Sequence, residues 1–312
     1  MHTELSDEAL EFGRLASRAL EAAGGDELVQ RAESAPAERG ARVVPVLAEL
    51  GAWDLDPRNS TEELEAAATL CRAAGHWCTP YPVAARLAGA FVVAAHDPAA
   101  PVAGLDGEWR ALTLDGRAAS ASARPSTVAP RYSAFVTGLD VGAWSAPGAA
   151  SADVPLALVL PCFTLLGMLD RALLLTREYV VQRRQFGQTL ASFQNVQFQL
   201  TDAEVERVGL EELAKYALWS IAAGRPDALA DALALRVAAL EAAEVVFRVT
   251  HQLHAAIGFC DETFVSWLSR HSQPLRRLPL GLSSTREALT GEVGRHGLSG
   301  LFDELAAPGG RR

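Results

Sequence analysis

The sequence predicts a mainly α-helical protein with a small β region in its middle and an antiparallel helix bundle towards its C-terminus. Three observations predict this: capping signals with helical periodicity near the N-terminus, a proline- and glycine-rich stretch of short alternating runs, and long apolar helical segments from Val154 onward. We therefore expect an N-terminal helical domain (1–96), a β middle domain (97–153) and a C-terminal helix-bundle domain (154–312).

Capping signals place two helices in the N-terminal region. Ser6, followed by two acidic residues, is typical of a helix N-cap. Ser60, with a glutamate three residues later, has the spacing of a capping box. We expect the second helix to run to Ala74 and to end at Gly75, and a further helix to cover about Val83 to Ala95.

The middle region has room for four or five short strands. Prolines and glycines separate its short alternating runs, and the clearest of these runs cover residues 110–114 and 132–137. The C-terminal region instead carries apolar residues at helical spacing over long segments joined by short turns, which indicates a bundle. Its expected helices cover residues 156–184, 190–222 and 228–257, with shorter ones after Asp261 and over 284–294.

Composition excludes several classes of protein. A formal charge of -10 and a pI near 5.2 argue against nucleic-acid binding, which needs clustered positive charge. The four cysteines lack zinc-ligand spacing and are expected to be small buried hydrophobes. The N-terminus has no pattern of a secretory signal, and no uncharged apolar run reaches about 18 residues. We therefore expect a cytoplasmic protein.

One segment, residues 177–194, combines arginines, a glycine and a following helix start. Arg183 and Arg184 lie at the expected end of a long helix, and Gly187 allows the chain to turn. The next helix is expected to begin around Ser192 and to offer free N–H groups. Arginine beside such a corner suits a phosphate or pyrophosphate, but both arginines could equally complement the helix dipole.

The same segment resembles the acyl-CoA dehydrogenase family. Residues 183–194 read Arg-x-x-Phe-Gly-x-x-Leu-x-x-Phe-Gln, and residues 252–259 are similar to that family's Gln-x-x-Gly-Gly-x-Gly-Phe segment, with alanines in place of the glycine pair. The likeness covers roughly residues 154–278 and implies an acyl-CoA dehydrogenase-like fold. It also implies that these residues hold the FAD of a neighbouring chain. The cofactor-binding residues by resemblance are Arg183, Gln185, Phe186, Gln194, Gln252 and Ala256.

The resemblance also shows what this chain lacks. The family needs a carboxylate to remove an α-proton from the substrate. One base position of the family falls on Pro279 and the alternative falls near Ala157, so no catalytic residue is assigned. The nearby carboxylates, Asp170, Asp261 and Glu262, are not expected to replace it. The β region is too short for the family's full β domain and lacks the segments that hold the flavin ring.

These departures imply a companion subunit. By resemblance, the chain is the small subunit of a heteromeric, FAD-dependent acyl-CoA dehydrogenase, paired as an α2β2 heterotetramer with a full-length paralogue that binds most of the acyl-CoA. Heterotetrameric members of the family often handle bulky steroid-derived thioesters, which suggests the substrate class. Two alternatives stay open: a flavin-free, non-catalytic scaffold subunit, and a stand-alone homo-oligomeric flavoprotein of secondary metabolism. No metal site is expected, although His251 and His254 share a helix face.

Overall fold

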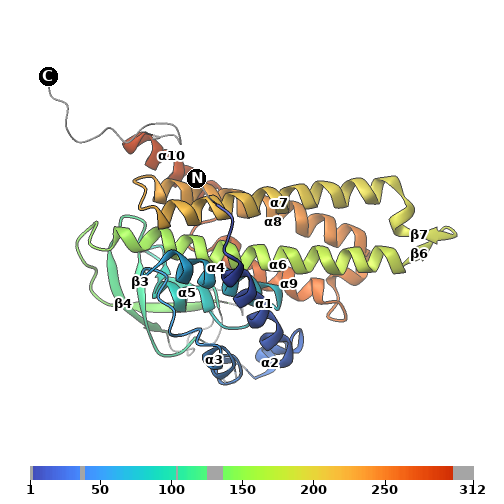
Figure 1. Cartoon of the computed structure of the whole chain (residues 1–312), viewed down its shortest axis with the longest axis horizontal. Coiled ribbons are helices and arrows are strands. Elements are labelled where there is room, and N and C mark those ends of the chain that lie inside the picture. Colours follow the sequence, from blue (N-terminus) through green and yellow to red (C-terminus); the bar gives the residue numbers. More distant parts are fainter. Residues whose placement is uncertain (1–2, 36–38, 103–104, 125–135, 298–312) are drawn as a thin grey trace.

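Three long helices run side by side along the long axis of the molecule and form its body (Figure 1). The computed structural model describes residues 3–35, 39–102, 105–124 and 136–297. The three helices are α6 (Val154–Gln182), α7 (Gln194–Ala222) and α8 (Ala228–His254), and α9 (Phe264–Arg277) and α10 (Leu282–His296) pack against them. The predicted helix bundle is therefore confirmed.

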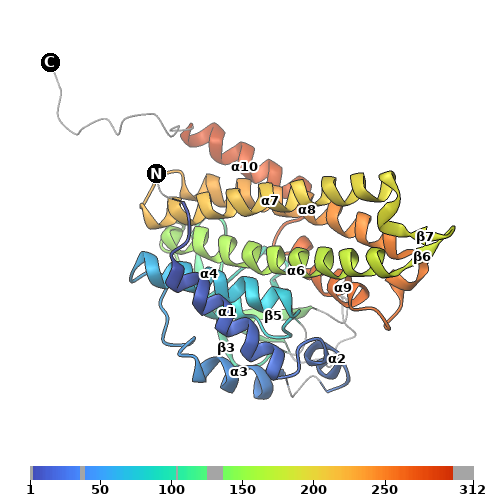
Figure 2. The same cartoon turned by 45° about the vertical axis from the view of Figure 1, so that its right-hand side comes forward.

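The N-terminal helices pack on one side of this bundle (Figure 2). They are α1 (Asp7–Ala22), α2 (Glu27–Ser34), α3 (Arg39–Glu49), α4 (Thr61–His76) and α5 (Val83–Ala88). Both predicted caps are present: the Ser6 hydroxyl accepts the backbone N–H of Ala9 at 3.3 Å, and the Ser60 hydroxyl accepts that of Glu63 at 3.2 Å. The Glu63 carboxylate accepts the N–H of Asp56 rather than closing the box on Ser60.

Two predicted helix ends in this region were wrong. Helix α4 does not stop at Ala74 but continues through Gly75 to His76. The helix expected over Val83 to Ala95 ends at Ala88, because Gly89 takes a left-handed conformation (φ 69°) and the chain then enters a strand. A glycine therefore ends α5, whereas Gly75 does not end α4.

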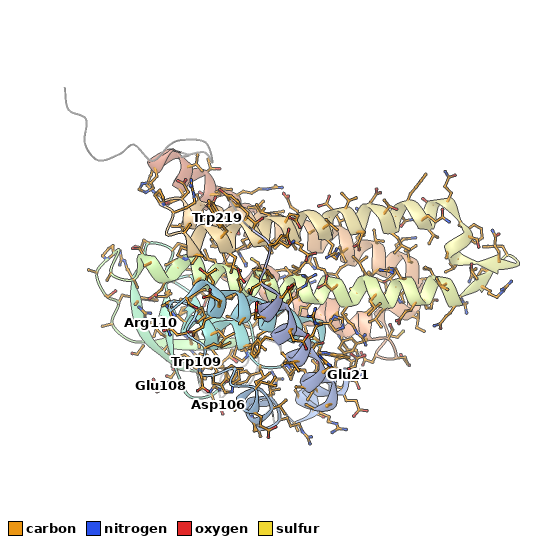
Figure 3. All side chains as sticks on the ribbon, viewed as in Figure 1. Glu21, Asp106, Glu108, Trp109, Arg110 and Trp219 are labelled. Atoms are coloured by element: carbon orange, nitrogen blue, oxygen red, sulfur yellow. The ribbon has the colours of Figure 1, made fainter. Side chains whose placement is uncertain are left out.

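The sheet lies at one end of the bundle and has the strand order β1-β3-β4-β5-β2. Strands β1 and β3 are parallel and the other pairs are antiparallel. Figure 3 labels Trp109 and Arg110 on β3, far from the opposite end of the bundle. The predicted run 110–114 overlaps β3, whereas most of 132–137 lies outside the described residues. The strands are β1 (Phe91–Val92), β2 (Ala99–Ala100), β3 (Glu108–Leu112), β4 (Ala118–Ala123) and β5 (Thr137–Val141).

Two glycines bring α4 and α6 into backbone contact. A Cβ atom added to Gly75 would lie 1.8 Å from the carbonyl oxygen of Thr164, and one added to Gly167 would lie 1.9 Å from that of Arg72. No side chain fits at either distance, so only glycine permits this crossing. The physical role of Gly75 is therefore close packing rather than helix termination.

An ion-pair network closes the same crossing. The guanidinium of Arg72 on α4 donates to both carboxylate oxygens of Asp170 on α6, at 2.6 and 3.1 Å, and to Glu211 on α7 at 2.7 Å. Arg207 on α7 donates to the same two carboxylates. Burial alone raises the pKa of Glu211, but hydrogen bonds and charges of the two arginines lower it to about 2. The network ties three helices together.

One hydrophobic core includes both the N-terminal helices and the bundle, whereas the sheet has a smaller cluster of its own around Phe91 and Leu139. The division into domains at residues 96 and 153 stays a prediction.

The segment Ser151–Gln182 is long and apolar enough to cross a membrane, but 78% of its most apolar window is buried inside the fold. That burial is typical of the core helix of a bundle.

Replacing either crossing glycine should destabilise the fold. We expect Gly75→Ala and Gly167→Ala each to lower the free energy of unfolding by about 3 kcal/mol or more, because the helices must separate. Urea denaturation measures this change. Gly209 lies within α7 with no atom within 4 Å of its added Cβ, so Gly209→Ala should raise stability by about 0.5–1 kcal/mol. Equal effects of all three substitutions would contradict the close crossing.

Stability should also depend on pH through His76, at the end of α4. Burial, with the charges of Arg171 and Arg72, lowers the pKa of this side chain to about 4. The unfolded chain therefore binds the proton first as the pH falls through its ordinary value of 6.5. As the pH falls from about 6.5 to 4, we expect protonation of His76 in the unfolded chain to lower the free energy of unfolding by up to roughly 3 kcal/mol.

The measurement is denaturant unfolding across this pH range. His76→Gln should remove this part of the pH dependence, while the matched substitution of the exposed His96 should leave it in place. Identical pH profiles for wild type and His76→Gln would show that another group controls acid stability.

Candidate functional site

A short β-hairpin projects from the end of α6, at the end of the bundle opposite the sheet (Figure 1). Its strands are β6 (Arg184–Gln185) and β7 (Gln188–Thr189). Phe186 and Gly187 form the turn, with φ of 50° and 81°. Two left-handed residues in a two-residue loop match the twist of a hairpin, which explains why the glycine is needed here. Phe186 is 89% exposed at its tip.

Arg183 lies where α6 ends and the hairpin begins. Its backbone N–H donates to the carbonyl of Tyr179 at 2.8 Å, while its exposed side chain has no hydrogen bond or ion pair to any described residue. Arg184, by contrast, donates to the carbonyl oxygen of Gly187 within the hairpin. The structure therefore leaves the charge of Arg183 available and uses Arg184 locally.

Helix α7 begins two residues after the predicted start around Ser192 and four after the start of the predicted range 190–222. Leu190–Ser192 form a single 3-10 turn, and α7 starts at Gln194 with Phe193 as its N-cap. No side chain accepts a hydrogen bond at this cap, so the first turn keeps free N–H groups. Gln194 is exposed, as is Gln185 in the hairpin. The corner thus offers N–H donors and amides beside Arg183.

The second motif lies at the end of α8. This helix ends at His254 rather than at Ile257, and Ala255–Phe259 form a 3-10 turn. Gln252 and Ala256 are both exposed there. Ala255 has φ 55° and ψ -140°, a conformation that favours glycine. The backbone shape expected of a glycine is therefore kept although the residue is alanine.

Histidines connect the two motifs. The ring of His254 stacks on Tyr179 of α6, with centroids 4.5 Å apart, and its Nδ1–H donates to the carbonyl of Thr250. His251 stacks on Phe259 at 4.3 Å and is hydrogen-bonded to Ser269. Burial lowers the pKa of both histidines, which therefore serve as neutral packing groups. Among the described residues no cluster of metal-ligating side chains is found.

Most exposed apolar side chains of the described residues lie on the elements that carry these motifs. Seven of the nine large hydrophobic residues that are exposed in the described part of the chain lie on the end of α6, the hairpin, α7 or the turn after α8. The seven are Val181, Phe186, Phe198, Val205, Val208, Ile257 and Phe259.

The two positions where the resemblance led us to expect a catalytic base lie together in a cavity near the other end of α6. Ala157 and Pro279 both line it, and it encloses about 1030 Å³ of empty space including its mouth. No described residue of its lining is acidic. Asp170 is held by Arg72, and the exposed Asp261 pairs with Arg270 at 2.6 Å, so neither carboxylate faces the cavity.

Sequence reasoning missed one residue of this cavity, Arg236. It lies in an alanine-rich stretch of α8 that has the ordinary periodicity of a buried helix, and nothing in its spacing distinguishes it. In the structure it is 3% exposed and donates to three carbonyl oxygens, one in the last turn of α9 and two just after that helix. Only the packing of α8 against the end of α9 identifies its surroundings.

Comparisons with known proteins agree with this arrangement. Residues 159–279 match the family described as "Acyl-CoA dehydrogenase, C-terminal domain". The acyl-CoA dehydrogenase FadE27 of Mycobacterium tuberculosis is 30% identical over 222 residues, which cover 67% of this chain and 51% of that protein. The chain therefore spans about half the length of this relative.

Two solved structures share the fold over nearly their whole length. The ChsE4–ChsE5 complex from Mycobacterium tuberculosis superposes with a TM-score of 0.74 at 16% identity, covering 94% of this chain and 99% of the other. A variant of the Tcur3481–Tcur3483 steroid ACAD gives 0.74 at 19% identity, covering 93% and 98%. The structures show the fold, and the family match with the FadE27 relative identifies the chain as a member of the acyl-CoA dehydrogenase family.

The conformation of Ala255 makes a stability prediction. Ala255→Gly should raise the free energy of unfolding by about 1 kcal/mol, because glycine adopts this φ and ψ without strain. Ala256 has no such conformation, and Ala256→Gly should lower stability by about 0.5–1 kcal/mol through added freedom of the unfolded chain. Thermal or urea unfolding of the pair measures both effects. A loss of stability in Ala255→Gly would contradict the strain.

Proposed function

We propose that this chain is a subunit of a heteromeric, FAD-dependent acyl-CoA dehydrogenase and that it completes the FAD site of a full-length paralogue. In an α2β2 assembly the paralogue supplies the base, the flavin cradle and most of the acyl-CoA site. This chain supplies contacts to one edge of the cofactor. The cofactor, when bound, accepts the hydride in α,β-dehydrogenation.

The separation of the two sites along α6 carries this proposal. From Ala157 to Arg183 the helix rises roughly 40 Å at about 1.5 Å per residue. A cofactor held beside Arg183 therefore cannot face a substrate in the cavity of the same chain. The exposed hairpin, the uncapped start of α7 and the end of α8 are placed to serve another polypeptide.

The residues at this end fit one edge of a dinucleotide. The guanidinium of Arg183 pairs with no described residue, and the first turn of α7 provides N–H donors, a combination suited to a pyrophosphate. Gln185, Gln194 and Gln252 are exposed amides, and Phe186 is an exposed ring. Ala256 lies in the 3-10 turn that begins at Ala255, the residue with the glycine-like backbone conformation. No described residue supplies a flavin-ring cradle, so the partner must.

The cavity supports the absence of a base in this chain. Ala157 and Pro279 share its wall and neither takes up a proton. A homo-oligomer of this chain alone would lack the group that removes the α-proton. We infer a bulky, steroid-derived acyl-CoA as the substrate class, because similar folds occur in a complex described as a steroid ACAD.

Co-expression with full-length acyl-CoA dehydrogenase paralogues tests the assignment. The expected product is a stable complex that contains flavin and turns over acyl-CoA, whereas this chain alone should do neither. A complex that turns over with flavin bound independently of this chain would favour a scaffold role. Dehydrogenation by the lone, FAD-reconstituted chain would establish the stand-alone flavoprotein instead.

Arg183→Ala tests the cofactor contact within that complex. Loss of a charged hydrogen bond should weaken FAD retention by roughly 10- to 100-fold, as expected for about 1.5–3 kcal/mol. The measurement is flavin released on dilution, followed by its fluorescence. Arg177→Ala, which removes another exposed arginine from the same helix, is the control and should retain FAD. Full flavin occupancy in Arg183→Ala would sink the role given to this residue.

A further inference from the structure

The cavity near the start of α6 has a basic, otherwise largely apolar wall. It is bounded by the start of α3, the end of α4 and its following loop, α5, β1, the residues after β2, α6, α8, and α9 with the residues that follow it. Most of its lining is alanine, proline, valine, leucine and other apolar side chains. Three side chains in the described lining are basic: Arg39, Arg236 and His271. Such a wall favours an apolar molecule that carries negative charge.

Arg236 is the most deeply buried of these groups. All three of its hydrogen bonds use Nη2, which donates to the carbonyl oxygens of Leu275, Leu278 and Leu280 at 3.2, 2.6 and 2.7 Å. Its Nε is buried without a hydrogen-bond partner, and Nη1 donates to no described residue. These carbonyls fix the guanidinium in place, so the group is rigid before any ligand arrives.

The charge of Arg236 has no acidic partner among the described residues, whereas the His271 side chain is hydrogen-bonded to Glu33 at 2.8 Å. A buried cation without an anion is costly, and carbonyl dipoles offset this only in part. A second polar atom of the wall, the Thr79 hydroxyl, is also buried without a hydrogen-bond partner. Both features indicate that the cavity is suited to a ligand with hydrogen-bonding oxygens.

We propose that this cavity binds an apolar carboxylic acid, with its carboxylate paired to Arg236 and its hydrocarbon part against the apolar wall. A carboxylate supplies both the missing charge and good acceptors for a guanidinium, whereas a neutral carbonyl supplies no charge. Because Ala157 and Pro279 provide no base, the ligand is held and released unchanged. The site is thus a binding site and not a second active site. It does not depend on the proposed contact with a partner's FAD.

Calorimetric titration of the full chain, alone or in its complex, tests the site with three probes of equal chain length. Decanoate should bind saturably, and 1-decanol should bind at least about tenfold more weakly, because it lacks the charged hydrogen bond. Decanoyl-CoA is the third probe and distinguishes a thioester site. Binding of the thioester without the free acid, or equal binding of acid and alcohol, would overturn the proposal.

Two variants locate the binding. Arg236→Met should weaken decanoate at least about tenfold and leave 1-decanol nearly unchanged, since only the charged hydrogen bond is lost. Arg248→Met removes an exposed arginine from the same helix and should change neither affinity. Decanoate affinity that survives Arg236→Met in a folded protein would overturn the assignment.

Arg236 also caps the end of α9, so its substitution could prevent folding. Ala157→Phe provides the independent variant, because it narrows the cavity from α6 and residue 157 takes part in none of the arginine's hydrogen bonds. It should abolish decanoate binding while the circular dichroism spectrum stays that of the wild type. In the complex, this variant also distinguishes decanoate binding in the cavity from binding at an acyl site of the partner. Unchanged decanoate binding in Ala157→Phe would place the ligand elsewhere and refute the proposal.

Discussion

The close crossing of α4 and α6 is the constraint on which the rest of the structure depends. Gly75 and Gly167 let the two backbones touch, which brings Arg72 within reach of Asp170 and, across the bundle, of Glu211. The crossing thereby joins the N-terminal helices to the bundle through one hydrophobic core. It also sets one wall of the cavity, because α4 and α6 both contribute to its lining. A wider spacing would loosen the core, the ion pairs and the cavity together.

Helix α6 separates two kinds of chemistry. Near its first turns lies a cavity with a buried cation and no described acid, and at its last turn lies an exposed rim of cationic, amide and aromatic groups. A rigid helix holds these regions too far apart to act on one substrate. In the proposed function the exposed end of α6 belongs to a site shared with another polypeptide, whereas the cavity is lined by this chain's own residues.

Local signals predicted the elements whose cause is local. The caps at Ser6 and Ser60 and the hairpin glycine Gly187 satisfy nearby backbone groups or permit a left-handed residue, so a few neighbouring residues determine them. Gly75 misled this reasoning because a glycine that ends a helix and one that lets helices touch look the same in sequence. The short helix α2 carries too little periodicity to be noticed.

The sequence by itself determined the family motifs, the bundle and the absence of an acid at Pro279 and Ala157, because residue identity and spacing carry that information. Only the tertiary structure decided that these two positions share one cavity and that Arg236 lines it with no acidic partner among the described residues. It also decided that Ala255 keeps a glycine-like conformation. The physical reason is that burial and charge pairing depend on residues from distant helices, and no local pattern encodes which of them meet.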